Sequence, residues 1–154
     1  MDVDARLSEL GLVLPPPAAP IANFVPCVQS GATLYVSGQV PRKDGQFAWV
    51  GKVGREVSLD DAKAAARTCA LAVLSLVKAH LGTLNRVSRV CMLQCFVNAV
   101  PEFTDQPAVA NGASDLLVQL FGDAGRHARF AVGAGSLPGN VAVEVAAIFE
   151  VAPA

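Results

Sequence analysis

The amino-acid sequence predicts a single α+β domain over residues 1–154, in which a mixed β-sheet carries two helices on one face. The length of 154 residues suits one ordinary domain. Strand-like and helical stretches follow one another in the order ββ(β)αβαββ. Two of the strand-like stretches are apolar on both faces, whereas a sheet with one face toward water alternates apolar and polar residues. Because two helices cover only one face, something else must bury the other.

The chain is expected to begin with a short helix over residues 4–10, closed by Gly11. The proline-rich run 15–20 favours polyproline II and is interpreted as an extended arm lying over the surface. A docking segment for a proline-recognising partner is the alternative interpretation. Residues 24–30 and 33–40 have the composition of two strands.

The most clearly marked element is a helix between Ser58 and Gly82, preceded by a turn at 41–45 and a short strand at 47–50. Ser58 and Asp61 form a capping-box-like start, and Gly82 suits the position just after the last turn. The apolar stripe of this helix consists of Ala62, Ala65, Ala66, Cys69, Val73, Leu76 and Val77, and His80 at its end is expected at the surface or edge of the helix rather than in a catalytic role. The outer face consists of Lys63, Arg67, Ser75 and Lys78.

The second half of the chain alternates again between strands and a helix. We expect a strand at 86–97, a helix from about 104–107 to Phe121, a strand at 127–134, a turn at 137–140 and a last strand at 141–151. Gly112 weakens the first half of the helix and Gly122 ends it. In the first strand we expect Val90, Met92 and Phe96 on one face and Cys91, Leu93, Cys95 and Val97 on the other. The turn predicts that the last two strands pair directly as a hairpin.

Composition excludes several classes of function. Only 16% of the residues are charged and the net charge is −1, with no cluster of basic residues, so nucleic-acid binding is disfavoured. No uninterrupted apolar run approaches the roughly 20 residues of a membrane helix. The acidic start lacks the features of a signal peptide, and we expect a cytoplasmic protein. The low charge and the apolar second face together predict a homo-oligomer.

The cysteines and histidines do not predict a metal site. Four cysteines occur without a CxxC pair, and there are two histidines, so the ligand spacing of a tetrahedral site is missing. The cysteines are expected to be reduced thiols. The sequence also lacks a GxSxG motif, a P-loop and a dinucleotide fingerprint.

Arg129 is the first candidate for chemistry. Ala131 and Gly133 share its side of the strand, and such small neighbours leave space beside a guanidinium, whose planar fork suits a carboxylate. A structural salt bridge is the alternative. Arg126 and His127, which follow a glycine-bounded loop, are candidates for lining the same mouth.

Glu144 is the second candidate, since it lies in a strand among small apolar residues. Desolvation there would raise the pKa of its carboxyl group, which suits proton transfer or water activation. A carboxylate paired with a base at the rim of the sheet is the alternative. Ser37 and Gly38 follow an apolar strand, where a glycine permits close approach of a ligand to the backbone. A bulge or strand end would explain the same glycine.

Three segments resemble the RidA/YjgF family. Tyr35–Pro41 reads YVSGQVP and is similar to a family segment, (V/I)SGQ(I/L)P. Arg129, then Leu137-Pro138, then Val141–Val145 (VAVEV) resembles its C-terminal signature, and 96–104 resembles its middle segment. The likeness spans about residues 20–151.

The resemblance implies a chorismate-mutase-like fold and a homotrimer with a central β-barrel and clefts between subunits. It implies hydrolysis of reactive 2-imino or 2-enamino acids to 2-oxo acids and ammonia, without a cofactor. It places the substrate carboxylate on Arg129, the handling of water on Glu144, and backbone contacts on Ser37 and Gly38. An asparagine of the second helix would correspond to Asn111.

Two departures from the family pattern keep other functions open. Deaminating members often carry tyrosine where this chain has Cys27, and a small polar residue and a cysteine where it has Phe130 and Ala131. These positions suggest a longer branch of the family. A non-catalytic module that binds a small carboxylated metabolite is the alternative function, and an endoribonuclease or translation inhibitor, older names in the family, is the third.

The predicted hairpin bears on how a site could form. A turn centred near residue 139 would pair Arg129 with a residue near 149, leaving Glu144 about five residues, or roughly 15 Å, away along the ladder. That distance is too long for both groups to touch one small substrate. We therefore expect the two residues to meet only across a subunit boundary.

Overall fold

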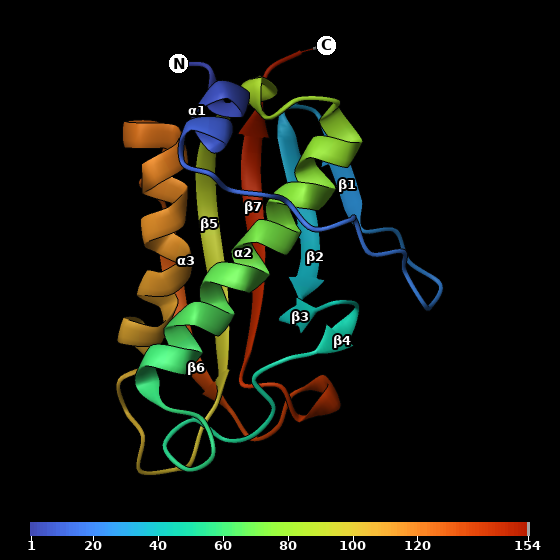
Figure 1. Ribbon diagram of the computed structural model, residues 1–154. Coiled ribbons are helices and arrows are strands. Elements are labelled where there is room, and N and C mark those ends of the chain that lie inside the picture. The colour runs from blue at the N-terminus through green and yellow to red at the C-terminus, as the bar shows by residue number, and fades with distance from the viewer. Residues whose placement is uncertain (154) are drawn as a thin grey trace.

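The computed structural model describes residues 1–153 and contains a five-stranded mixed sheet in the order β1-β2-β7-β5-β6 (Figure 1). The strands are β1 (Cys27–Ser30), β2 (Thr33–Gln39), β5 (Val87–Asn98), β6 (Ala128–Ala134) and β7 (Val143–Val151). Neighbouring strands are antiparallel except β5 and β6, which are parallel. The predicted turn at 41–45 and strand at 47–50 are instead a small hairpin of β3 (Arg42–Lys43) and β4 (Gln46–Phe47).

The helices lie on one face of the sheet, as the sequence predicts. They are α1 (Val3–Glu9), α2 (Leu59–Leu81) and α3 (Gln106–Phe121), with short 3-10 turns at Leu84–Arg86, Gly122–Gly125 and Pro138–Asn140. In Figure 1, α2 and α3 lie side by side in front of the strands, and α1 lies near the upper end of β5. The main hydrophobic core fills the space between α2, α3 and this face of the sheet.

Helix α2 begins and ends where its capping residues predict. The Ser58 hydroxyl accepts a hydrogen bond from the Asp61 amide at 3.1 Å, and Gly82 takes the left-handed conformation with φ 84°. By length and composition alone α2 could cross a membrane, but 56% of its most apolar window is buried inside the protein, as in the core helix of a globular domain.

Ser75 is the exception on the outer face of α2. The side chain was expected to be exposed, but the residue is only 5% exposed, because its hydroxyl donates a 2.5 Å hydrogen bond to the Pro15 carbonyl. The proline-rich arm therefore crosses over α2, as Figure 1 also shows. Amphipathic periodicity could not show this contact, because the covering segment lies 60 residues earlier in the chain.

Gly112 explains how the two large helices approach each other. A Cβ atom at this position would lie 2.0 Å from the Lys63 carbonyl oxygen of α2, too close for any side chain. The glycine that lowers the helix propensity of α3 is thus the residue that lets α3 pack directly on the α2 backbone.

The predicted hairpin between the last two strands is wrong. Strand β6 pairs with β5 in parallel, and β5 lies between β6 and β7. Helix α3 is the crossover of a β5-α3-β6 unit, which delivers β6 to the edge of the sheet. The doubly apolar β5 gains a partner on each side, and the 3-10 turn at Pro138–Asn140 carries the chain past it to β7.

The sheet presents an apolar second face that nothing among residues 1–153 covers. Among the exposed apolar side chains, Val28, Tyr35, Phe130 and Val132 are 52%, 48%, 37% and 42% exposed, and the strand register places them on the face away from the helices. The rings of Phe96 and Phe130 pack edge to face on this side, with centroids 5.5 Å apart.

One predicted side-chain direction in β5 is wrong. Val90 was expected on the face of Met92 and Phe96, but it is fully buried on the helix side. The pairing of β5 with β7 shifts register between Val90 and Met92. Because of this irregularity, Val90 and Met92 point to opposite faces of the sheet, although simple alternation would place them on the same face.

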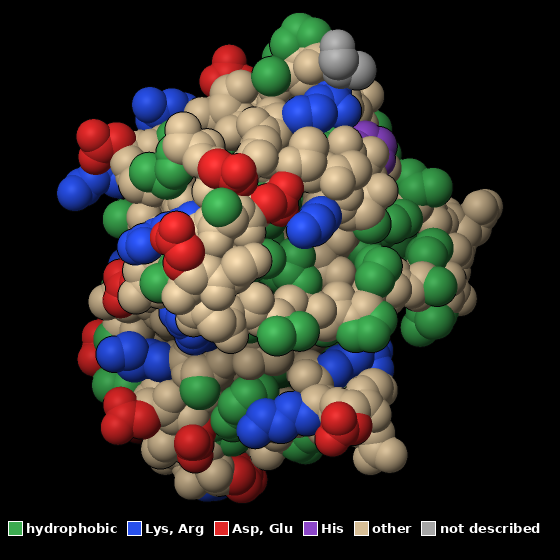
Figure 2. All heavy atoms as spheres, turned by 45° about the horizontal axis from the view of Figure 1, so that its top comes forward, with side chains coloured by type: hydrophobic (Ala, Val, Ile, Leu, Met, Phe, Trp, Pro, Cys, Tyr) green, Lys and Arg blue, Asp and Glu red, His purple; other side chains and the backbone are tan. Residues whose placement is uncertain are grey.

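Charged side chains do not gather on the face of the molecule seen in Figure 2. Lysine and arginine side chains are interspersed there with aspartate and glutamate. This mixture agrees with the net charge of −1 and with the absence of basic runs in the sequence.

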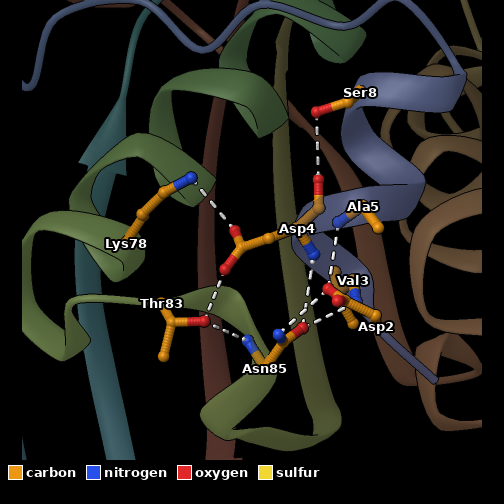
Figure 3. A network of polar contacts seen from close by, with 8 residues as sticks. All are labelled: Asp2, Val3, Asp4, Ala5, Ser8, Lys78, Thr83 and Asn85. Carbon is orange, nitrogen blue, oxygen red and sulfur yellow. Dashed lines mark hydrogen bonds and ion pairs between the residues drawn. The ribbon is translucent and has the colours of Figure 1, made fainter.

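A polar network fastens α1 to the rest of the domain (Figure 3). The Asn85 side-chain oxygen accepts from the amides of Val3 and Asp4 at 2.6 and 3.3 Å, and its amide group donates to Asp2 at 3.0 Å. Asp4 accepts from the Thr83 hydroxyl and forms a 3.0 Å ion pair with Lys78.

Acid should loosen this attachment. The pKa of Asp2 is lowered, chiefly by the hydrogen bond from the Ala5 amide. Burial raises the pKa of Asp4, but Thr83 and Lys78 outweigh it and leave that pKa lowered. Groups with a lowered pKa stabilise the folded form above their ordinary value, here 3.8, and lose that contribution as the pH falls below it.

We therefore expect the NMR shifts of residues 3–9 to move toward unfolded values as the pH is lowered from 6 to about 2.5, before those of α2. An Asp4→Asn variant should lose part of this pH dependence. Residues 3–9 that keep their helical shifts while α2 unfolds would contradict the account.

Candidate functional site

Arg129 lies on the edge strand β6, and its side chain points toward α3. Its Nη1 donates to the Asn111 side-chain oxygen at 2.9 Å and to the Ser114 hydroxyl at 3.0 Å. Its Nη2 donates to the Pro107 carbonyl at 3.3 Å. One face of α3 therefore holds the guanidinium through three neutral oxygen atoms.

The guanidinium keeps donors for a further partner. It carries five N–H groups, and the contacts with α3 use three of them, which leaves donors on Nε and Nη2. Among residues 1–153, no carboxylate forms an ion pair with Arg129. The alternative of a structural salt bridge within the chain does not describe this side chain. Ala131 and Gly133 follow on the same face and are small, as the spacing predicts.

His127 joins this group through Ser114. Its Nε2 lies 2.9 Å from the Ser114 hydroxyl, and its Nδ1 lies 2.6 Å from the Gly125 carbonyl oxygen. Arg129, Asn111, Ser114 and His127 thus form one cluster between β6 and α3, here called the arginine cluster.

Glu144 lies on the central strand β7, on the open face of the sheet. Its backbone pairs with Phe96 of β5, and on the other side its carboxylate lies against Gly38 of β2. A Cβ atom at residue 38 would come within 2.7 Å of the Glu144 Oε1 atom. Burial raises the pKa of the Glu144 carboxyl group, as its apolar surroundings predict.

Ser37 and Gly38 form a bulge that makes room for Glu144. Three steps along β2, from Val36 to Gln39, match two steps along β7, from Ala147 to Val145. The bulge interpretation of the glycine is therefore right, and the same bulge brings a residue without a side chain next to the carboxylate.

Within one chain, Arg129 and Glu144 are far apart and face opposite ways. Arg129 is level with Leu93 of β5, which is level with Ala147 of β7, three residues from Glu144. Two strand spacings and three residues along the strand give roughly 14 Å. Arg129 points to the helix side and Glu144 to the open side, so a single chain cannot present both groups to one small molecule. The separation predicted from a hairpin is thus similar in size but has another cause.

Arg126 and Cys27 lie outside both groups. The exposed side chain of Arg126 pairs with Asp123 at 3.4 Å and does not reach the arginine cluster. Cys27 faces the core from β1 and lines an apolar hollow of about 440 Å³ together with residues 17–20 and His80. Burial raises the pKa of the Cys27 thiol to about 11, which disfavours the nucleophilic thiolate form.

Cys95 lies beside the candidate site, although the sequence did not single it out. It is the direct strand partner of Ala131, on the same side of the sheet. Burial raises the pKa of its thiol to about 12, although the positive charge of Arg129 opposes this shift. All four cysteines are free, and no group of three or more potential metal ligands occurs among residues 1–153.

Sequence reasoning missed Ser114 and the Pro107 carbonyl as partners of Arg129. The usable signal was helical spacing, because Pro107, Asn111 and Ser114 recur at intervals of four and three and so share one face of α3. Using that signal would have required knowing that β6 lies beside this face of α3.

Comparison with known proteins shows which family the chain belongs to. A sequence model of the family described as YjgF/chorismate mutase-like, putative endoribonuclease, matches residues 4–151. Protein TCP17 of Trypanosoma cruzi is 50% identical over 149 residues, covering 96% of this chain and 93% of that protein.

Solved structures agree. The protein Atu1372 of Agrobacterium tumefaciens is 48% identical, with a TM-score of 0.91 over 97% of this chain and 92% of that one. TdcF of Escherichia coli, solved with bound serine, is 21% identical, with a TM-score of 0.64 over 89% and 94% of the two chains, and shows the same fold. With the family match covering nearly the whole chain, the protein belongs to the YjgF family, whose fold is that of chorismate mutase-like proteins.

Proposed function

We propose that the protein hydrolyses reactive 2-imino or 2-enamino acids to 2-oxo acids and ammonia, in clefts between the subunits of a cytoplasmic homotrimer. The observation that carries the proposal is the hydrogen bonding of Arg129. Its guanidinium is held by neutral oxygens, keeps free donors and has no carboxylate partner among the described residues. A substrate carboxylate would complete its hydrogen bonds and balance its charge.

The open face of the sheet supports the oligomer. Exposed apolar residues on this face, such as Tyr35 and Phe130, favour burial against other copies of the chain. Three sheets facing one another around a threefold axis would form a central barrel. Glu144, half-buried on this same face, would then lie where subunits meet, and the edge strand β6 would bring a neighbour's Arg129 to the boundary.

The chemistry suits a carboxyl group with a raised pKa. The oxygen of a water molecule adds to the electrophilic C=N carbon, and the nitrogen takes up a proton. The hydroxyl group of this adduct then passes its proton to the nitrogen as the C–N bond breaks, so ammonia leaves and the 2-oxo acid remains. Glu144 would orient the water and pass its proton to the nitrogen. An imine is already electrophilic, so this reaction needs no cofactor.

Two further observations fit a small carboxylated substrate. TdcF, which shares the fold, holds serine, a small molecule with a carboxylate. Gly38 has no side chain and lies directly against the Glu144 carboxylate, so a ligand held by Glu144 would be close to the main chain of Ser37 and Gly38.

A non-catalytic carboxylate-binding module is the second candidate. It is favoured by the apolar Ala131 beside Arg129 and by the orientation of Cys27 toward the core, since neither position offers a polar group to a substrate. An endoribonuclease, the activity in the family description, is less well supported, because acidic and basic side chains are intermixed on the surface in Figure 2.

The first prediction concerns the carboxylate. A charged hydrogen bond contributes roughly 1.5–3 kcal/mol, so Arg129→Ala should weaken binding of pyruvate or 2-oxobutyrate at least about tenfold. Arg126→Ala is the matched control, because it removes an exposed arginine three residues away that pairs with Asp123, and it should bind like the wild type. Calorimetry checks both variants, and unchanged affinity in Arg129→Ala would remove Arg129 from the site.

The second prediction separates hydrolysis from binding. With an imine generated by a pyridoxal-phosphate-dependent dehydratase, the wild type should accelerate ammonia release, and Glu144→Gln should abolish the acceleration while still binding 2-oxobutyrate. Gly38→Ala should act similarly, because the added methyl group displaces the Glu144 carboxylate without altering its charge. A wild type that binds 2-oxobutyrate but does not accelerate hydrolysis would favour the binding module.

A further inference from the structure

The arginine cluster contains a chain of hydrogen bonds whose direction is fixed by its two ends. At one end, the Nη1 group of Arg129 can only donate, so Ser114 Oγ accepts from it. At the other end, the Gly125 carbonyl can only accept, so His127 Nδ1 carries the hydrogen that it receives. The hydrogen bonds at both ends therefore have the same donor-to-acceptor direction, from the guanidinium toward the Gly125 carbonyl.

The middle of the chain follows from these ends. In a neutral imidazole with hydrogen on Nδ1, the other nitrogen, Nε2, is an acceptor. Ser114 has one hydroxyl hydrogen and lies 2.9 Å from that nitrogen, so it donates to Nε2 while accepting from Arg129. Ser114 and His127 then each accept from one neighbour and donate to the next, without conflict.

We propose that Ser114 and His127 are positioning residues for Arg129, and that the Nδ1–H tautomer of His127 fixes the orientation of the Ser114 hydroxyl that receives the guanidinium. This inference rests on the proposed role of Arg129 in binding a carboxylate. The hydrogen bonds of His127 go to Ser114 and the Gly125 carbonyl, so it acts on the guanidinium through Ser114.

The position of the cluster shows why such support matters. Arg129 lies on an edge strand, where the residues along its own face, Ala131 and Gly133, are too small and apolar to hold a guanidinium. All three groups that hold it lie on α3, and a flexible arginine loses less conformational freedom on binding if its rotamer is already fixed. Ser114 is the partner whose own orientation depends on another side chain.

The tautomer is tested in the ligand-free protein. The chain has two histidines, His127 and the exposed His80, so two-bond ¹⁵N–¹H correlation spectra contain two imidazoles. At about pH 8, His127 should show hydrogen on Nδ1 and none on Nε2. Ser114→Ala should change the His127 nitrogen shifts and leave those of His80 unchanged. A Nε2–H tautomer of His127 in the wild type would overturn the proposal whatever the protein binds.

Binding tests the consequence. Loss of one neutral hydrogen bond should weaken binding of 2-oxobutyrate roughly two- to tenfold in Ser114→Ala and in His127→Phe. Ser114→Thr keeps the hydroxyl, and His127→Gln keeps an acceptor near the place of Nε2, so both should recover part of the affinity. Asp115→Ala changes the adjacent exposed residue of α3 and should bind like the wild type.

The outcomes separate the two proposals. If the wild type binds no 2-oxo acid, the proposed function fails. The tautomer spectra still decide whether the chain of hydrogen bonds from Arg129 to the Gly125 carbonyl exists. If the wild type binds but Ser114→Ala and His127→Phe, folded by circular dichroism, bind equally well, the positioning role is overturned. Should Ser114→Ala fail to fold, the same comparison is made between His127→Gln and His127→Phe.

Discussion

The structure depends on one constraint: the sheet is apolar on both faces, and the helices of the chain cover only one. Buried valine, alanine and phenylalanine residues of β7 pack under α2, while Ala146 and Ile148 on the same strand point to the opposite face. Removing that second apolar face from water is worth about 25 cal/mol per Å². This is the physical reason for proposing that the chain functions only with other copies of itself.

The same constraint divides the candidate site. Glu144 lies on the face that the oligomer would bury, and burial within the single chain already raises the pKa of its carboxyl group. Arg129 lies on the other side of the sheet and at its edge, held by α3. Under the proposed function, each chain thus offers half of an imine-hydrolysing site, and the proposed trimer would complete it. The bulge at Ser37 and Gly38 gives the Glu144 carboxylate its room, because a side chain at residue 38 would occupy the same space.

The sequence was sufficient for features that follow from local patterns. Helix α2 begins and ends at its capping residues, and the two-sided apolar strands correctly predict an uncovered face. It was insufficient where distant segments meet. Strand pairing depends on α3 carrying β6 to the far side of β5, and the burial of Ser75 depends on a segment 60 residues away.

The candidate site could likewise be predicted from local sequence patterns only in part. Small residues beside Arg129 and the apolar setting of Glu144 could be read from strand alternation, and the YjgF resemblance identified the family that the comparisons show. The contacts of Arg129 with Ser114, and through it with His127, could not be read, because they require the position of α3 relative to β6. Arg126 illustrates the converse error, since proximity in sequence to Arg129 did not place its side chain in the cluster.

The central claim is that a working site combines Arg129 of one subunit with Glu144 of another. Its most direct test mixes two inactive variants, Arg129→Ala and Glu144→Gln, and refolds them together. If subunits assemble at random in equal amounts, roughly one cleft in four should contain both wild-type groups, and hydrolysis of the imine should reappear at about that fraction of the wild-type rate. Mixtures that assemble yet stay as inactive as either parent, while the wild type is active, would contradict a shared site.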